Sequence, residues 1–201
     1  MSQDTNTNAR VIAQRQKNKE RIEILENFVA AGVEIPCFDG VIIDRDVTIS
    51  AGTTVLPGTI LRGETTVGEN CVLGPNTLVE NSKIGNNVLL NSTQCYQSTV
   101  KDGANIGPFV HIRPNSVVGE QVHLGNFVEV KNSTIDTGTK VSHLTYVGDS
   151  DVDILTARRA GVPCISVLWG FRDRPFLERH GATCLAETPA DILALLDADE
   201  G

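Results

Sequence analysis

The sequence predicts an all-β parallel β-helix of about six coils, preceded by a helical arm and followed by a small α/β segment. An aliphatic residue recurs at nearly every sixth position through residues 41–152, and neither a 3.6-residue nor a two-residue period gives one apolar face there. Many of these residues have a small or β-branched residue two positions before them. The six-residue period is absent on both sides, which divides the chain into residues 1–32, 33–152 and 153–201.

Residues 7–31 are expected to form the helical arm. Their apolar residues are spaced among Lys, Arg, Glu and Gln as in a helix, and Gly32 is a suitable C-terminal cap. The first turns are nearly all polar, so we expect only the last turns to dock on the rest of the chain.

Each group of six residues in the middle part is expected to form one short strand and one corner, and three groups close a coil of about 18 residues. Residue i then lies beside residue i+18 at a strand spacing of about 4.8 Å. Proteins with this six-residue pattern are left-handed β-helices, an exception to the usual crossover rule. The expected inward positions, with five-residue steps before 84 and 135, are 43, 49, 55, 61, 67, 73, 79, 84, 90, 96, 100, 106, 112, 118, 124, 130, 135, 141 and 147.

Residues 153–201 alternate helical and strand patterns. We expect a helix ending at Gly161, a strand within 162–169, a helix ending at Gly181, a strand within 182–187, and a last helix starting at Thr188-Pro189. Two strands are too few for an independent α/β domain. The segment could cover the open strand edge of the β-helix, or it could fail to pack against it.

Composition excludes several classes of function. The chain has 201 residues, 17 basic and 25 acidic, and its net charge of −8 argues against nucleic-acid and anionic-membrane partners. No apolar stretch reaches the roughly 20 residues that span a bilayer, and the first thirty residues are too polar for a signal peptide. Five cysteines without a CxxC pair fit neither a disulfide framework nor a zinc site, so we expect a cytoplasmic protein with reduced thiols.

Arg113 and Lys131 stand 18 positions apart and are expected to lie one above the other on adjacent coils. Like charges opposite each other destabilise a strand pair, so two such cations favour an anion such as a phosphate between them. The alternative is a solvated surface pair whose side chains point apart.

His143 and Tyr146 are expected one coil above Gly125 and Val128, with His143 near a corner. Histidine is the usual general base near neutral pH, although an ordinary surface histidine is the alternative. The other three histidines, His111, His123 and His180, do not have metal-ligand spacing. His111 and His123 precede inward residues and should therefore face outward.

The stretch "GPFVHIRPNSVVGEQVHLGNFVEVKNSTIDTGTKVSHLTYVGDSDV" resembles the acetyltransferase half of the bifunctional N-acetylglucosamine-1-phosphate uridyltransferase/glucosamine-1-phosphate acetyltransferase family. The resemblance covers roughly residues 18–152, and "IRPN", "GNFVEVK" and "SHLTYVGD" are its most specific motifs. It implies a homotrimer that transfers an acetyl group from acetyl-CoA to the amine of glucosamine 1-phosphate. It also implies His143 as catalytic base and a sugar-phosphate site of Arg113, Lys131 and Tyr146.

The chain departs from that family after "YVGD". Family members continue with several more coils, which carry further sugar-binding residues and most of the acetyl-CoA groove, and those coils have no counterpart here. Residues 147–197 instead resemble the C-terminal end of a haloacid-dehalogenase-type phosphatase of the phosphoglycolate phosphatase kind. In that resemblance Asp149 and Asp153 correspond to magnesium-site acids, but the nucleophilic Asp and the Ser/Thr and lysine motifs are absent, so Mg²⁺ is not expected.

Four interpretations follow from these two resemblances. The chain is an acetyltransferase with an incomplete acetyl-CoA site, a non-catalytic trimeric sugar-phosphate-binding or structural protein, a phosphatase-family remnant, or a non-functional recombinant product. The last interpretation arises because the two family patterns meet in the shared "VGDSDV" stretch, as in a chimera.

Overall fold

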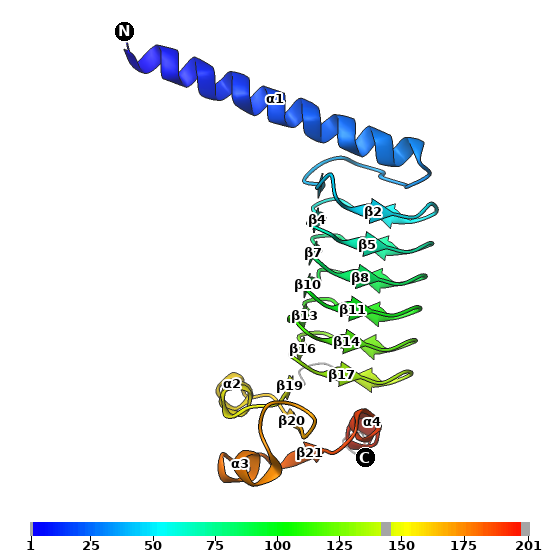
Figure 1. Ribbon diagram of the computed structural model, residues 1–201, viewed down its shortest axis with the longest axis vertical. Coiled ribbons are helices and arrows are strands. Elements are labelled where there is room, and N and C mark those ends of the chain that lie inside the picture. The colour runs from blue at the N-terminus through cyan, green and yellow to red at the C-terminus, as the bar shows by residue number, and fades with distance from the viewer. Residues whose placement is uncertain (1, 142–145, 198–201) are drawn as a thin grey trace.

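The computed structural model describes residues 2–141 and 146–197 (Figure 1). It is a left-handed parallel β-helix with one long helix at the N-terminal end and a small α/β cap at the other. The predicted fold class is therefore confirmed.

Three sheets of parallel two- or three-residue strands form the walls of the β-helix. The first sheet contains β1 (Ile42–Ile43), β4 (Ile60–Arg62), β7 (Leu78–Glu80), β10 (Gln94–Tyr96), β13 (His111–Ile112), β16 (Glu129–Val130) and β19 (Tyr146–Gly148). The second contains β2 (Thr48–Ile49), β5 (Thr66–Val67), β8 (Lys83–Ile84), β11 (Thr99–Val100), β14 (Val117–Val118) and β17 (Thr134–Ile135). The third contains β3 (Thr54–Val55), β6 (Val72–Leu73), β9 (Leu89–Leu90), β12 (Asn105–Ile106), β15 (His123–Leu124) and β18 (Lys140–Val141).

The interior of the β-helix is a column of aliphatic side chains, one from each strand, and nearly all of them are fully buried. The residues two positions earlier are buried as well, including a set of threonines. Their hydroxyls are hydrogen-bonded, since Thr53 Oγ1 donates to the Gly68 carbonyl at 2.8 Å and Thr59 Oγ1 to the Leu73 carbonyl at 3.2 Å. Buried hydroxyls with partners let small β-branched residues line the corners without a desolvation penalty.

One predicted inward position is wrong. Cys95, not Tyr96, faces the core, because Cys95 pairs with Val79 on one side and Ile112 on the other. Cys95 is fully buried, whereas Tyr96 is partly exposed. Two five-residue steps, from Leu90 to Cys95 and from Cys95 to Val100, replace the expected steps of six and four residues, because Cys95 is the residue in register with the inward Val79 and Ile112.

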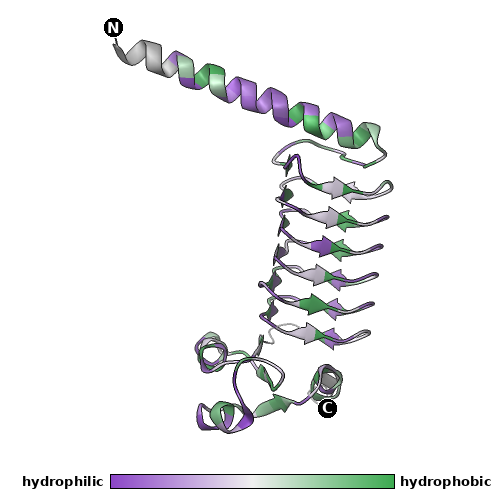
Figure 2. Cartoon of the chain, in the orientation of Figure 1, coloured by the Kyte–Doolittle hydropathy of each residue, from purple (hydrophilic) through white to green (hydrophobic). Residues whose placement is uncertain are grey.

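The N-terminal helix α1 (Ser2–Ala30) extends across the first coil and beyond it (Figure 1). Figure 2 shows that much of α1 is hydrophilic, and residues 8–19 are exposed. Its last turns dock as predicted, with Leu25 fully buried and Arg21 Nη1 donating to the carbonyls of Phe38 (2.8 Å) and Val41 (2.9 Å). Among the described residues, no helix combines the length and the hydropathy that crossing a membrane requires.

The C-terminal segment packs onto the open end of the β-helix. It consists of α2 (Asp151–Ala160), β20 (Cys164–Val167), α3 (Arg174–Arg179), β21 (Cys184–Ala186) and α4 (Pro189–Asp197). Strand β20 pairs in parallel with β19 and β21 with β20, so the cap continues the first sheet, while α4 packs against β17 and β18. The cap therefore covers the strand edge that a β-helix otherwise exposes to another chain.

The alternation of burial along β9 gives a matched test of the fold. Replacing Leu90 (0% exposed) with Ala should lower the free energy of unfolding by about 2–5 kcal/mol, because it leaves a cavity in the core column. Its neighbour Leu89 is 39% exposed, and Leu89→Ala should cost less than about 1 kcal/mol. Urea unfolding followed by circular dichroism measures both, and equal losses would contradict the inward assignment.

Thiol labelling tests the corrected register around Cys95. Burial raises the pKa of the Cys95 thiol to about 12, so the native protein should leave this residue unmodified while the exposed Cys37 reacts quickly. Peptide mass spectrometry after brief alkylation identifies the modified residue, with the urea-unfolded protein as the control in which every cysteine reacts. Rapid native labelling at Cys95 would restore the register with Tyr96 inside.

Candidate functional site

The structure stacks Arg113 and Lys131 as predicted. They directly follow β13 and β16, which pair through His111–Glu129 and Ile112–Val130. The backbone N–H of Arg113 donates to the Val130 carbonyl at 2.8 Å, which fixes the two cationic residues on adjacent coils.

Tyr146 lies one coil further, but above Glu129 rather than above Val128 as expected. The five-residue step before Ile135 makes this coil 17 residues long, residue 146 over residue 129, instead of 18. The shift of one position brings the Tyr146 hydroxyl to a carboxylate. Sequence reasoning missed Glu129 because it applied the 18-residue spacing across this step.

Five side chains form a continuous charged cluster: Arg113, Glu129, Lys131, Tyr146 and Asp153. Arg113 Nη1 donates to Glu129 Oε1 at 3.0 Å, and Lys131 Nζ lies 3.2 Å from Asp153 Oδ1. The Tyr146 hydroxyl lies between the two carboxylates, 3.0 Å from Glu129 Oε1 and 3.3 Å from Asp153 Oδ1. Burial, followed by the charges of Glu129 and Asp153, raises the pKa of Tyr146, so its hydroxyl stays protonated as a donor.

Asp153 belongs to the first turn of α2 and reaches the cluster from the cap. Its Oδ2 accepts hydrogen bonds from Ser150 Oγ at 2.5 Å and from the Asp149 backbone N–H at 3.1 Å. Gly148 makes this approach possible, because a Cβ there would clash with the Asp153 side chain. The carboxylate is 1% exposed and is held by donors on every side.

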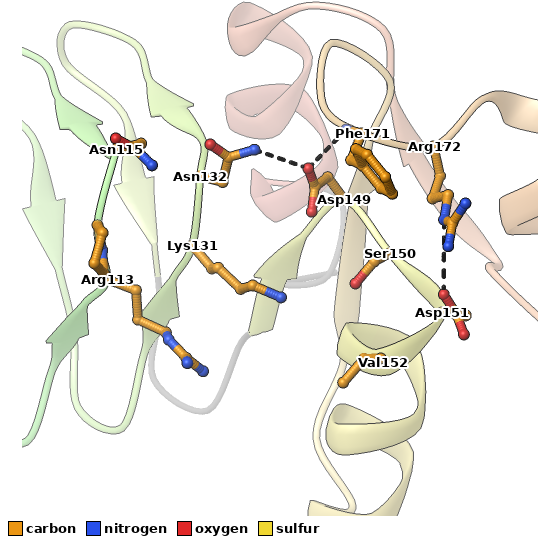
Figure 3. Close-up of a pocket in the computed structure, with 11 residues that line it drawn as sticks. Arg113, Asn115, Lys131, Asn132, Asp149, Ser150, Asp151, Val152, Phe171 and Arg172 are labelled. Atoms are coloured by element: carbon orange, nitrogen blue, oxygen red, sulfur yellow. Dashed lines mark hydrogen bonds and ion pairs between the residues drawn. The ribbon is translucent and has the colours of Figure 1, made fainter.

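Asp149 ties the cap to the β-helix at the same place. Its Oδ2 accepts from Asn132 Nδ2 at 3.0 Å and from the Phe171 backbone N–H at 2.7 Å (Figure 3). A Cβ at Gly170 would clash with Asp149, so the loop before α3 can come close only because residue 170 is glycine. Asp149 and Asp153 therefore have structural partners within the chain.

A cavity of about 540 Å³ lies between the last coils and the cap (Figure 3). Arg113, Lys131 and Asn132 line it from the β-helix. Ser150, Asp151, Phe171 and Arg172 are among the residues that line it from the cap. The Arg172 guanidinium lies over the rings of Phe171 (4.6 Å) and Phe176 (4.3 Å), and its Nε is 3.9 Å from Asp151 Oδ1. The cavity is thus open to a small polar ligand beside the charged cluster.

The predicted base, His143, lies outside the described residues. His123 is exposed as expected, whereas His111 is only half-exposed and makes an edge contact with the Tyr96 ring at 5.6 Å. Burial lowers the pKa of His111. His180 lies in the cap, with Nδ1 2.8 Å from the Phe176 carbonyl.

The residues present do not fit a magnesium site. Asp149 and Asp153 point toward different partners, and a lysine ammonium lies against Asp153. In the described part of the chain, no group of three or more His, Cys, Asp or Glu side chains is arranged to hold a metal ion. Divalent cations need several oxygen ligands turned to one point, whereas these two carboxylates accept from the donors of neighbouring protein groups.

A family model of the bacterial transferase hexapeptide (six repeats) matches residues 97–132. The chain is 41% identical over 152 residues to the bifunctional protein GlmU of Shouchella clausii, covering 76% of this chain and 34% of that protein. It is 47% identical over 112 residues to GlmU of Enterococcus faecalis, covering 56% of this chain and 24% of that protein. The chain thus spans about a third or less of the length of these relatives.

Among solved structures, a hexapeptide transferase family protein from Anaplasma phagocytophilum superimposes with a TM-score of 0.51 at 20% identity, covering 65% of this chain and 83% of that chain. This likeness supports the β-helix fold alone. None of these comparisons supports the phosphatase resemblance of residues 147–197 or a chimeric origin, which stay hypotheses.

Removing Lys131 should destabilise the protein more than removing Arg113. Lys131→Met leaves the buried Asp153 carboxylate without its cation, and we expect a loss of about 1–3 kcal/mol in the free energy of unfolding. Arg113→Met breaks a more exposed pair, with side chains 44% and 23% exposed, and should cost about 0–1 kcal/mol. Urea unfolding of the two variants decides the order, and a greater loss for Arg113→Met would be inconsistent with a buried Lys131–Asp153 pair.

Proposed function

We propose that this chain, whose coils form a hexapeptide-repeat acetyltransferase region homologous to the C-terminal half of the bifunctional GlmU proteins, is an acetyltransferase that acts on an amino-sugar phosphate. The observation that carries the proposal is the stacking of Arg113 and Lys131 on adjacent coils, with the Tyr146 hydroxyl joined to both cations through Glu129 and Asp153.

In this proposal the phosphate of glucosamine 1-phosphate binds between Arg113 and Lys131, and Tyr146 contacts the sugar. Two cations on adjacent coils, one strand spacing apart, suit the several oxygens of a phosphate. The adjoining cavity of about 540 Å³ is large enough for a sugar phosphate. Glu129 would orient Arg113 and the Tyr146 hydroxyl, since it bonds to both.

His143 is the proposed general base. It would take a proton from the substrate ammonium, so that the nitrogen lone pair attacks the acetyl-CoA carbonyl. The C–S bond then breaks, and the departing thiolate takes up the second proton that the acylated nitrogen loses, which releases CoA as the thiol. Such proton transfer contributes about 10²–10⁴-fold to a rate, and holding the two substrates together supplies much of the remainder.

The acetyl-CoA half of the proposed site would be built partly by the cap. Strands β20 and β21 and helix α4 lie where further coils would continue, so acetyl-CoA would have to bind against the cap. A homotrimer, as in the family that the sequence resembles, would add a neighbouring β-helix to each site. A cytoplasmic location is proposed on the same resemblance.

A second candidate is a non-catalytic trimer that binds a sugar phosphate. The position of the cap favours it, because the cap replaces coils instead of leaving the end of the β-helix open. This candidate keeps the roles of Arg113, Lys131 and Tyr146 and differs only in lacking acetyl transfer.

Release of free CoA thiol from acetyl-CoA on addition of glucosamine 1-phosphate tests the proposed activity. We expect turnover in the wild type and a loss of about 10²–10⁴-fold in His143→Ala, because the base is gone. His123→Ala, which removes an exposed histidine elsewhere on the coils, is the matched control and should retain the wild-type rate.

Turnover that persists in His143→Ala would refute the role of His143. No turnover from folded protein that still binds glucosamine 1-phosphate would leave the non-catalytic trimer as the function. No binding and no turnover would reject both.

A further inference from the structure

The cap places a carboxylate in the cationic site. Asp153 Oδ1 lies 3.2 Å from Lys131 Nζ and 3.3 Å from the Tyr146 hydroxyl. These are two of the three side chains that the proposed function assigns to the sugar phosphate. Asp153 comes from α2, outside the β-helix, so its position depends on the cap and not on the coils.

The second oxygen of the same carboxylate is held by the cap itself. Ser150 Oγ and the Asp149 backbone N–H both donate to Asp153 Oδ2. An ammonium, a phenol, a hydroxyl and a backbone N–H therefore surround one anionic group. These are the same kinds of donor that bind a phosphate oxygen. Asp153 therefore takes the place that an anionic ligand would take beside Lys131 and Tyr146.

The Asp153 carboxylate and a ligand phosphate cannot both pair with Lys131, because both are negatively charged. Without Asp153, the cluster holds two cations, Arg113 and Lys131, against one carboxylate, Glu129. With Asp153 it holds two cations against two carboxylates and has no excess positive charge. A phosphate that approached Lys131 would meet a fixed negative charge about one hydrogen-bond length from the ammonium, which costs affinity.

The structure also provides a place for the competing anion. Lys131 is 30% exposed and lines the cavity, whereas Asp153 is 1% exposed and does not line it. Lys131 can therefore leave Asp153 and turn toward a ligand in the cavity, but Asp153 cannot follow it.

We propose that Asp153 is an internal competitor for the anion site, so that the cap autoinhibits binding of phosphate-bearing ligands at Arg113 and Lys131. The inference rests on the proposed function for the location of the anion site and adds its regulation. An anion binds once Lys131 is released from Asp153, and any change that moves α2 away from Gly148 increases the affinity.

Isothermal titration calorimetry at low ionic strength tests this with inorganic phosphate and glucosamine 1-phosphate as probes. Asp153→Asn should bind both probes at least about tenfold more tightly than wild type, because Lys131 becomes an unpaired cation. Neutral N-acetylglucosamine should gain nothing from the substitution. A gain for glucosamine 1-phosphate without one for inorganic phosphate would overturn the charge argument.

Asp136→Asn is the matched control. Asp136 is exposed, directly follows β17 and does not line the cavity, and its Oδ1 accepts from the Thr137 backbone N–H at 2.8 Å. Loss of this carboxylate removes the same charge but should change phosphate affinity less than about threefold, because an exposed charge outside the site is screened. Equal gains in Asp136→Asn and Asp153→Asn would show a general charge effect and refute the specific competition.

The double variant Asp153→Asn with Lys131→Met separates direct competition from loosening of the cap. It should bind phosphate no better than wild type, because the gain acts through Lys131. Asp153→Ser, whose hydroxyl can still accept from the Asp149 N–H, replaces Asp153→Asn if that variant fails to fold, as judged by its melting temperature.

The outcomes separate this inference from the proposed function. Equal phosphate affinities in wild type and Asp153→Asn, with Lys131→Met weaker than both, would refute autoinhibition and keep the anion site. No phosphate binding by any folded variant would refute the anion site itself, and the proposed function with it.

Discussion

The stacking of the coils is the constraint on which the rest of the structure depends. Each inward side chain must lie over the inward side chain of the neighbouring coil, because an offset of one residue would turn a polar side chain into the core. Coils of 16, 17 and 18 residues all satisfy this rule here, as the pairings Val79–Cys95, Val130–Val147 and Leu61–Val79 show. Shorter coils lose a corner residue, not a strand. The register of the outward residues follows from the register of the core, and this places Arg113 beside Lys131 and Tyr146 beside Glu129.

The C-terminal end of the β-helix must be covered. A parallel β-helix has backbone donors and acceptors at its last strand that need partners. Strand β20 supplies them along one sheet, and α4 packs beside the other two. Two glycines, Gly148 and Gly170, allow the cap to come close enough for Asp153 and Asp149 to bond across the junction. The same contacts that close the end of the β-helix therefore bring acidic groups to its cationic column.

This coupling links stability to ligand affinity. A buried ion pair is costly to break by removing one partner, because the remaining charge is left without compensation. In the pair of Lys131 and Asp153 the carboxylate is buried and the ammonium is partly exposed, and Tyr146 joins this pair to the more exposed pair of Arg113 and Glu129. A ligand anion could replace Asp153 as the partner of Lys131, but only by leaving the carboxylate with its two donors from the cap. The free energy of the cap junction thus opposes occupation of the site.

The sequence alone determined the β-helix, the docked end of the arm, the α/β pattern of the cap and the stacking of Arg113 over Lys131. A six-residue period and an unbroken 18-residue spacing are local properties, so they can be read along the chain. The inward Cys95, the position of Tyr146 over Glu129 and the entry of Asp153 into the column were decided only by the tertiary structure. The positions of Cys95 and Tyr146 depend on which residue is omitted at a shortened corner, and the six-residue pattern does not specify that residue. The third depends on how a separate segment docks, and packing between segments distant in the fold has no signature in their spacing.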